Sequence, residues 1–155
     1  MMSDLRPKLY RFALALTKRV DEAEDVVQEV GIIMWKRHED LCTIRSFEAY
    51  AMSSVRNRCL DYIRSPRYRT EEINETFDTS HEQTPYKSLE RDDMVSFVKR
   101  LIEQLPEQQQ SVIRLRDVEG YEFDEIAEIL GMSDNAVRTN LSRARQKIRE
   151  VLLKQ

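Results

Sequence analysis

Polar and basic side chains recur at helical spacing close to the C-terminal end of this chain. At about 100° per residue they fall within or beside one arc of a single helix: Asn135, Arg138, Thr139, Ser142, Arg143, Gln146 and Arg149. Amide, hydroxyl and guanidinium groups are the donors and acceptors with which proteins contact base edges and phosphates. The spacing therefore predicts a surface that binds DNA. For a basic helix considered alone, a solvated charged face would be the simpler interpretation.

The residues before this helix favour DNA binding, because they predict the turn that would position it. A shorter amphipathic helix comes first, with an apolar face formed by Phe123, Ile126, Ala127 and Leu130. Gly131 can adopt the left-handed conformation that ends a helix, and Ser133 is suited to cap the next one. The inner face of the basic helix would consist of Val137, Leu141, Ala144 and Ile148. This order is that of a helix-turn-helix.

Other kinds of chemistry have no matching pattern in the sequence. There is no glycine-rich phosphate loop, nucleophile motif or carboxylate–histidine cluster, and His38 and His81 stand alone. Cys42 and Cys59 lack paired metal-ligand spacing, so we expect free thiols. No run of eighteen apolar residues and no secretory signal is present. We therefore expect a cytoplasmic protein that is not an enzyme and needs no metal, cofactor or small-molecule substrate.

Charge is distributed unevenly along the 155 residues, although the net charge is only −3. Residues 1–70 carry 13 basic and 10 acidic side chains, residues 71–93 carry 2 and 8, and residues 133–155 carry 6 and 2. Two regions with a basic excess are thus separated by an acidic one. A basic surface attracts nucleic acid independently of its sequence by releasing counterions from phosphates.

Recurring amphipathic segments with few glycines and prolines predict an all-α fold. Before the helix-turn-helix, helices are expected over residues 5–18, 21–37 and 46–64, from about residue 88, and over 107–117. The stretch between about residues 66 and 85 is polar and acidic without a sustained period, which is typical of a linker. We predict two small helical domains, residues 1–66 and 88–155, joined by a flexible acidic linker at 67–87.

The helices over 21–37 and 46–64 each carry an unusual outward face. The first displays acidic and apolar groups together: Asp25, Gln28, Glu29, Ile32 and Trp35. This mixture suggests docking onto a basic, partly apolar partner. The alternative is that Ile32 and Trp35 pack against neighbouring helices, which we favour for Trp35 because large aromatic side chains are usually well buried.

The outward face of the helix over 46–64 carries an aromatic, amides and charges: Tyr50, Ser54, Asn57, Asp61 and Arg64, flanked by Arg56 and Arg58. Its inward face would consist of Met52, Val55, Cys59, Tyr62 and Ile63. Aromatic groups stack on bases, amides contact their edges and arginines follow phosphates, so this face could hold an unstacked single strand. A plain solvated helix face explains the pattern equally well.

Two segments resemble a known family. DEAEDVVQEVGIIMWKR (21–37) and LPEQQQSVIRLRDVEGYEFDEIAEILGMSDNAVRTNLSRARQKIRE (105–150) are similar to sigma factors of bacterial RNA polymerase. The likeness is to the compact sigma-70 type that has only regions 2 and 4, the extracytoplasmic-function (ECF) group. It covers nearly the whole chain apart from the predicted linker, with both segments in the expected order.

The resemblance implies a role for each predicted surface. Contact with core RNA polymerase, through the clamp helices of its largest subunit, is implied for Asp25, Gln28, Glu29 and Ile32. Contact with the −10 element is implied for Arg45, Ser46, Tyr50, Asn57 and Asp61, with residues 41–46 as the loop that captures a flipped base. Contact with the −35 element in promoter DNA is implied for Asn135, Arg138, Thr139, Ser142 and Arg143. The helices before the helix-turn-helix would hold the flap tip of the other large subunit.

The family usually pairs with an anti-sigma factor, often membrane-bound, and we expect the free chain to be a monomer. This sequence departs from many relatives at three places. The capture loop LCTIRSF (41–47) lacks the glycine and the acidic residue that relatives often have there. Many relatives have a tryptophan near the position that Tyr50 occupies in this chain. Glu122 stands where relatives often have a serine or threonine cap. Two other functions compete with initiation: a stand-alone helix-turn-helix regulator, and a sigma mimic that titrates an anti-sigma factor.

Overall fold

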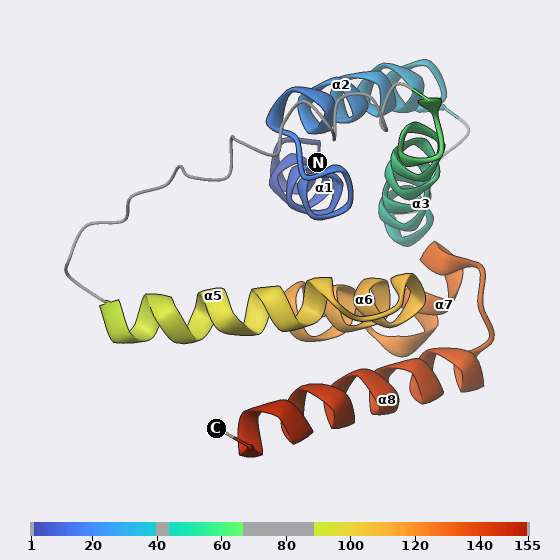
Figure 1. Ribbon diagram of the computed structural model, residues 1–155. Helices are drawn as coiled ribbons and strands as arrows, with labels where there is room; N and C mark the ends of the chain where they lie inside the picture. The colour runs from blue at the N-terminus through green and yellow to red at the C-terminus, as the bar shows by residue number, and fades with distance from the viewer. Residues whose placement is uncertain (1, 40–43, 67–88, 155) are drawn as a thin grey trace. The chain divides into compact units, whose positions relative to one another are not determined.

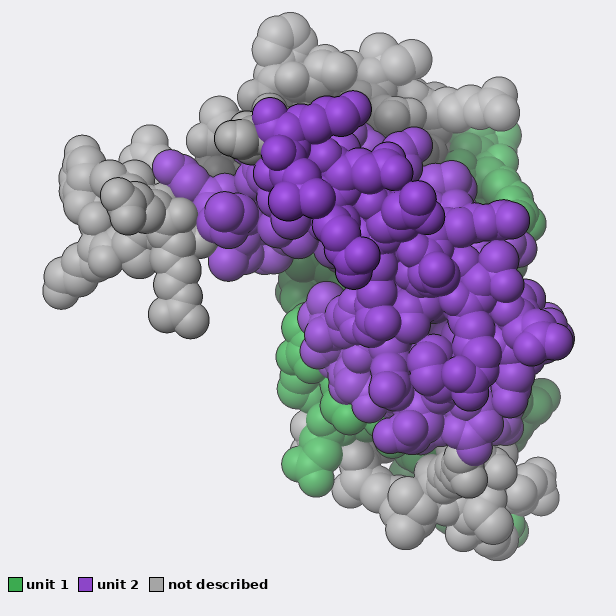
Figure 2. Space-filling model, turned by 90° about the horizontal axis from the view of Figure 1, so that it is seen from below, with its two compact units in different colours: residues 1–79 green, residues 80–155 purple. Residues whose placement is uncertain are grey.

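Helices account for all regular secondary structure in the computed structural model, which describes residues 2–39, 44–66 and 89–154, with side chains from 4–39, 47–66 and 93–154. The prediction of an all-α fold is confirmed. The chain divides into two compact units, residues 1–79 and 80–155, coloured separately in Figure 2. This division falls inside the predicted linker, whose residues lie outside the described ranges. No helix within those ranges has the length and apolarity needed to cross a bilayer.

The described part of unit 1 contains α1 (Met2–Thr17), α2 (Val20–Lys36) and α3 (Ile44–Ile63). Each of them packs against the other two, as Figure 1 shows. Their apolar faces meet in a core whose members include Leu5, Leu9, Phe12, Val26, Val27, Val30, Met34, Met52, Val55 and Cys59. Met52, Val55 and Cys59 of the predicted inward face of α3 are thus confirmed as core residues. Tyr62 and Ile63 differ, because each is only half-buried.

Unit 2 contains α5 (Leu89–Glu103), α6 (Glu107–Ile113), the π-helical turn η2 (Arg114–Val118), α7 (Phe123–Leu130) and α8 (Asp134–Leu153). Helix α8 packs against α5, α6 and α7 (Figure 1). Its buried residues Val137, Leu141 and Ala144 form the predicted inner face, with Ile148 half-buried. They contact a core that also contains Leu105, Val112, Leu115, Tyr121, Ile126, Ile129 and Leu130.

The single helix predicted over 107–117 is instead two elements, α6 and η2. In the π-helical turn the Glu119 N–H donates to the Arg114 carbonyl at 3.0 Å, an i to i+5 bond that widens the helix by one residue. The Tyr121 N–H then donates to the Leu115 carbonyl at 2.9 Å, and both of these side chains are buried. The wider turn thus leads the chain from α6 into the loop before α7.

The turn between α7 and α8 has the predicted stop and start signals. Gly131 has φ 66° and ψ 36°, the left-handed conformation expected of a helix C-cap. The Ser133 hydroxyl accepts a hydrogen bond from the Ala136 N–H at 3.1 Å, as an N-cap should. At the start of α7 the Glu125 carboxylate accepts from the Glu122 N–H at 2.9 Å. A capping box with Glu122 as the cap residue therefore begins α7.

Candidate nucleic-acid and protein interfaces

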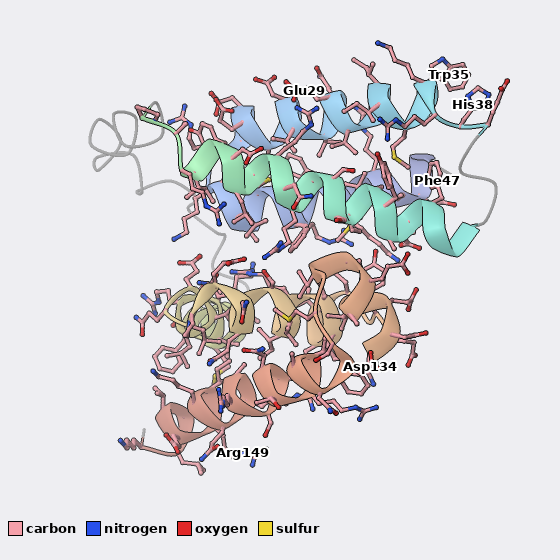
Figure 3. The ribbon with its side chains drawn as sticks, turned by 90° about the vertical axis from the view of Figure 1, so that its right-hand side faces the viewer. Glu29, Trp35, His38, Phe47, Asp134 and Arg149 are labelled. Carbon is pink, nitrogen blue, oxygen red and sulfur yellow. The ribbon has the colours of Figure 1, made fainter. Side chains whose placement is uncertain are left out.

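The predicted recognition face of α8 is exposed along the helix. All five residues assigned to it are exposed, and none hydrogen-bonds or ion-pairs through its side chain with another described residue: Asn135, Arg138, Thr139, Ser142 and Arg143. Figure 3 labels Asp134, the first residue of this helix, and Arg149, which lies one turn before its end. The structure thus places the five predicted residues on one helix, with their donors and acceptors available to a ligand.

Arg145 lies close to this face but is already engaged. Its Nε and Nη2 donate to the two carboxylate oxygens of Asp117, at 3.0 and 2.5 Å. These hydrogen bonds, together with the charge of Asp117, raise the pKa of Arg145. The pair joins α8 to η2 across 28 residues of sequence. Arg145 therefore links α8 to η2, a contact that its position in the basic run did not indicate.

A hollow of about 510 Å³ lies beside the recognition face. It is lined by Phe123, Arg138, Leu141, Ser142, Arg145, Gln146 and Arg149. The Arg138 guanidinium carbon lies 4.3 Å from the centroid of the Phe123 ring, and that of Arg116 lies 4.6 Å from it. Sequence reasoning assigned Phe123 to an apolar helix face and gave no role to Arg116. No spacing rule connects residues on three different elements.

The predicted polymerase-binding face of α2 is also exposed. Asp25, Gln28, Glu29 and Ile32 all face solvent, and Ile32 is 56% exposed. The Glu29 carboxylate accepts a hydrogen bond of 2.6 Å from Arg58 on α3. This ion pair spans the edges of two helices whose exposed faces were predicted to bind different partners.

Trp35 is exposed, so our prediction that it packs against a neighbouring helix is wrong. The side chain is 73% exposed and stacks on His38, with ring centroids 5.1 Å apart and an interplanar angle of 21°. Figure 3 shows the two rings together at the end of α2, with Glu29 earlier on the same helix. Helical geometry places Trp35 about 180° from Val26, which lies in the core. The outward face of α2 therefore combines acidic groups with two exposed apolar ones.

On α3, the predicted single-strand face is only partly described. Asn57 and Asp61 are exposed one turn apart, while Tyr50 is half-buried. The Tyr50 hydroxyl accepts a hydrogen bond of 2.6 Å from Arg37, which follows α2. The side chains of Arg45 and Ser46, and the loop residues 41–43, lie outside the described part of the structure.

A second hollow, of about 600 Å³, opens between α5, the α6–η2 segment and the end of α8. It is mostly apolar and is lined by Val98, Ile102, Ile113, Asp117, Val118, Arg145, Ile148, Arg149, Leu152 and Leu153. Val118 and Leu153 are 61% and 78% exposed. An exposed apolar hollow of this size is typical of a site that binds another protein. Sequence reasoning assigned such a role to these helices without identifying the residues.

The described fold defines a two-unit helical protein in which one unit carries a helix-turn-helix. Family models match both units: "Sigma-70 region 2" over residues 1–69 and "Sigma-70, region 4" over residues 98–148. The chain therefore belongs to the sigma-70 family of RNA polymerase sigma factors, in its ECF group, as the named relatives also indicate.

Two relatives and one solved structure illustrate the likeness. The ECF RNA polymerase sigma factor SigL of Mycobacterium tuberculosis is 31% identical over 150 residues, covering 93% of this chain and 82% of SigL. The probable RNA polymerase sigma factor RfaY of Xanthomonas campestris is 30% identical over 146 residues, but this chain spans only 36% of its length. The sigma factor RpoE of Bartonella quintana, solved in complex with the anti-sigma factor NepR, has a TM-score of 0.72 at 24% identity. That match covers 97% of this chain and 93% of RpoE. It establishes similarity of fold.

Proposed function

We propose that this protein binds core RNA polymerase and directs it to promoters by recognising −35 and −10 elements and assisting DNA melting. The observation that carries this proposal is the state of α8. Its five predicted recognition residues are exposed and make no side-chain hydrogen bond or ion pair with another described residue, whereas neighbouring Arg145 is held by Asp117. A helix that presents free amide, hydroxyl and guanidinium groups is suited to the major groove, where such groups distinguish base pairs.

Helix α3 of unit 1 would contact the −10 element as a single strand. Asn57 and Asp61 present hydrogen-bonding groups one turn apart, and the Tyr50 ring, held by Arg37, offers a surface on which a base can stack. The cost of unpairing the bases would be offset by their new contacts with the protein. Opening of this kind needs no covalent chemistry, so the proposed role is not enzymatic.

Docking on polymerase would use both units. The exposed face of α2 pairs the acidic Asp25 and Glu29 with the apolar Ile32 and Trp35, which suits a basic, partly apolar helix pair such as the clamp helices. In unit 2 the apolar hollow beside Val118 and Leu153 suits the flap tip. An anti-sigma factor that covered these surfaces would keep the protein, a monomer in the cytoplasm, from reaching polymerase.

The deciding experiment incubates the purified protein with bacterial core RNA polymerase and transcribes a library of genomic fragments with the complex. We expect co-purification with the core enzyme and discrete new start sites preceded by shared −35 and −10 sequences. Failure to bind the core enzyme, combined with tight binding of the free protein to a palindromic duplex, would identify a stand-alone regulator instead. Binding to an anti-sigma factor without any binding to polymerase or DNA would identify a sigma mimic.

A matched pair of variants tests the docking face of α2 in the same assay. Ile32→Lys adds a charge to this face, while Val20→Lys adds one at the first residue of the same helix, where the native side chain is equally exposed at 55%. We expect Ile32→Lys to weaken binding to the core enzyme at least about tenfold, because desolvating a lysine within an apolar contact is unfavourable. Val20→Lys should bind like the parent, and equal losses in both variants would exclude a specific role for Ile32.

A further inference from the structure

The Phe123 ring joins two arginines from elements on either side of it in the chain. Phe123 is the first residue of α7, Arg116 lies on η2 and Arg138 lies on α8. Both guanidinium groups lie over the ring, 4.6 Å from its centroid for Arg116 and 4.3 Å for Arg138. The face of an aromatic ring attracts a cation through its quadrupole, so Phe123 provides a favourable site for each group.

The two arginines differ in what else they bind. Arg116 Nη1 donates to the Tyr121 carbonyl at 2.9 Å and lies 3.5 Å from a carboxylate oxygen of Glu122. Its donors are thus directed into the loop before α7. Among the described residues the Arg138 guanidinium is positioned by the Phe123 ring alone, because no hydrogen bond or ion pair engages its side chain. Its N–H donors stay available although its position is restricted.

That combination is suited to an arginine that binds DNA. An exposed arginine normally samples many rotamers and loses that freedom when it binds, which weakens its contribution to affinity. A ring contact restricts these rotamers in advance and uses none of the strong donors that a phosphate or base edge would need. The hollow beside the pair, which also contains Ser142 and Arg149, provides open space next to the guanidinium.

We propose that Phe123 is a positioning residue for promoter recognition: its ring holds Arg138 in the orientation from which that arginine contacts DNA. This inference rests on the proposed function, since it requires Arg138 to bind the promoter. Phe123 itself has no polar group and acts only through Arg138. Its effect on DNA binding should therefore vanish when Arg138 is absent.

The test is a double-mutant cycle measured on the complete complex of the protein, core polymerase and promoter DNA. Phe123→Leu keeps an apolar side chain but removes the ring face, and it should weaken promoter binding about threefold. In an Arg138→Ala background the same replacement should have no further effect. Phe123→Tyr keeps the ring and should bind the promoter as tightly as the parent protein does. Thermal unfolding of each variant excludes loss of fold as the cause.

A second measurement examines the contact without DNA. In the free protein, the side-chain protons of Arg138 should show an upfield ring-current shift in NMR spectra that Phe123→Leu abolishes and Phe123→Tyr retains. An unchanged shift would overturn the inference, as would equal losses of binding in both backgrounds. If Arg138→Ala leaves promoter binding intact, the positioning role fails while the initiation role stands. If the complex of the parent protein with core polymerase does not bind promoter DNA, the positioning role and the initiation role both fail.

Discussion

Arg143 is the residue on which promoter specificity is most directly tested. It is exposed on the recognition face of α8 and unengaged among the described residues. If it makes a bidentate contact with a guanine, Arg143→Ala should weaken use of the matching −35 element by about 1–3 kcal/mol. The measurement is promoter binding by the polymerase complex on a set of −35 variants. The loss should disappear on promoters that lack the contacted base pair.

Lys147 provides the matched control, because it is a basic, exposed residue one helical turn after Arg143 that is not among the predicted −35 contacts. Lys147→Ala removes the same charge and should affect all promoters little and equally. A uniform loss in Arg143→Ala would instead assign this arginine to the phosphate backbone.

Cys59 provides a prediction about pH. The thiol is fully buried on α3, its Sγ is 4.0 Å from the Ala13 carbonyl oxygen, and burial raises its pKa to about 12. The folded state therefore keeps the thiol neutral, whereas the unfolded chain ionises near its ordinary pKa of about 8.5. The buried thiol therefore makes its full contribution to the free energy of unfolding below about pH 8.5. This contribution is lost as the pH rises toward 12, by at most about 1.4 kcal/mol per pH unit.

The measurement compares urea unfolding of Cys42→Ser with that of Cys42→Ser, Cys59→Ala between pH 7.5 and 10.5. Other titrating groups are common to the two proteins, so the difference isolates Cys59. The difference in free energy of unfolding between the two proteins should shrink as the pH rises. A difference that stays constant would contradict a buried neutral thiol.

The exposure of single residues was predicted well where it depends on one helix, and their contacts were predicted poorly where they depend on a distant partner. The exposure of Asn135, Thr139 and Ser142 follows from spacing along α8. The pairing of Arg145 with Asp117 joins residues 28 positions apart, and no periodicity connects them. Trp35 was misjudged because average burial of aromatic residues outweighed the helical angle that places it outward.

At the scale of elements, the helix-turn-helix turn depends on a backbone conformation that few residues adopt. Gly131 has φ 66°, and a Cβ at this position would meet no other atom within 4 Å. Gly131→Ala should therefore destabilise unit 2 by about 1–2 kcal/mol through conformational strain alone. Gly131→Asn should cost less, because asparagine tolerates the left-handed region. Denaturant unfolding followed by circular dichroism measures both, and equal costs would point to a cause other than the backbone.

The bounds of most helices were predictable, since apolar periodicity and cap residues act locally. The α7–α8 turn was anticipated in detail for this reason. The π-helical turn at Arg114–Val118 was not, because one inserted residue leaves the apolar spacing of a short helix almost unchanged. That turn carries Asp117 and Arg116, so missing it also hid the Arg145 and Phe123 contacts.

At the scale of the whole molecule, the sequence predicts that neither unit reads a promoter alone. Elements about 16–17 base pairs apart are separated by roughly 55 Å. A flexible chain of about 20 residues, the length of the predicted linker, reaches at most about 70 Å when extended and about 25 Å when relaxed. It can join the two sites without fixing their separation. Under the proposed function, polymerase must therefore set the spacing, and we expect the free protein to bind promoters weakly.

The two units also have separate cores, so damage to one should leave the other intact. Leu115 is fully buried in unit 2 and Met52 is fully buried in unit 1. Leu115→Ala should cost unit 2 about 2–5 kcal/mol, which is a large part of the stability of so small a domain. Hydrogen exchange should accelerate in α5–α8 while the amides of α1–α3 keep their protection. Met52→Ala should give the reverse pattern. Accelerated exchange in both units from either substitution would show that they unfold as one cooperative body.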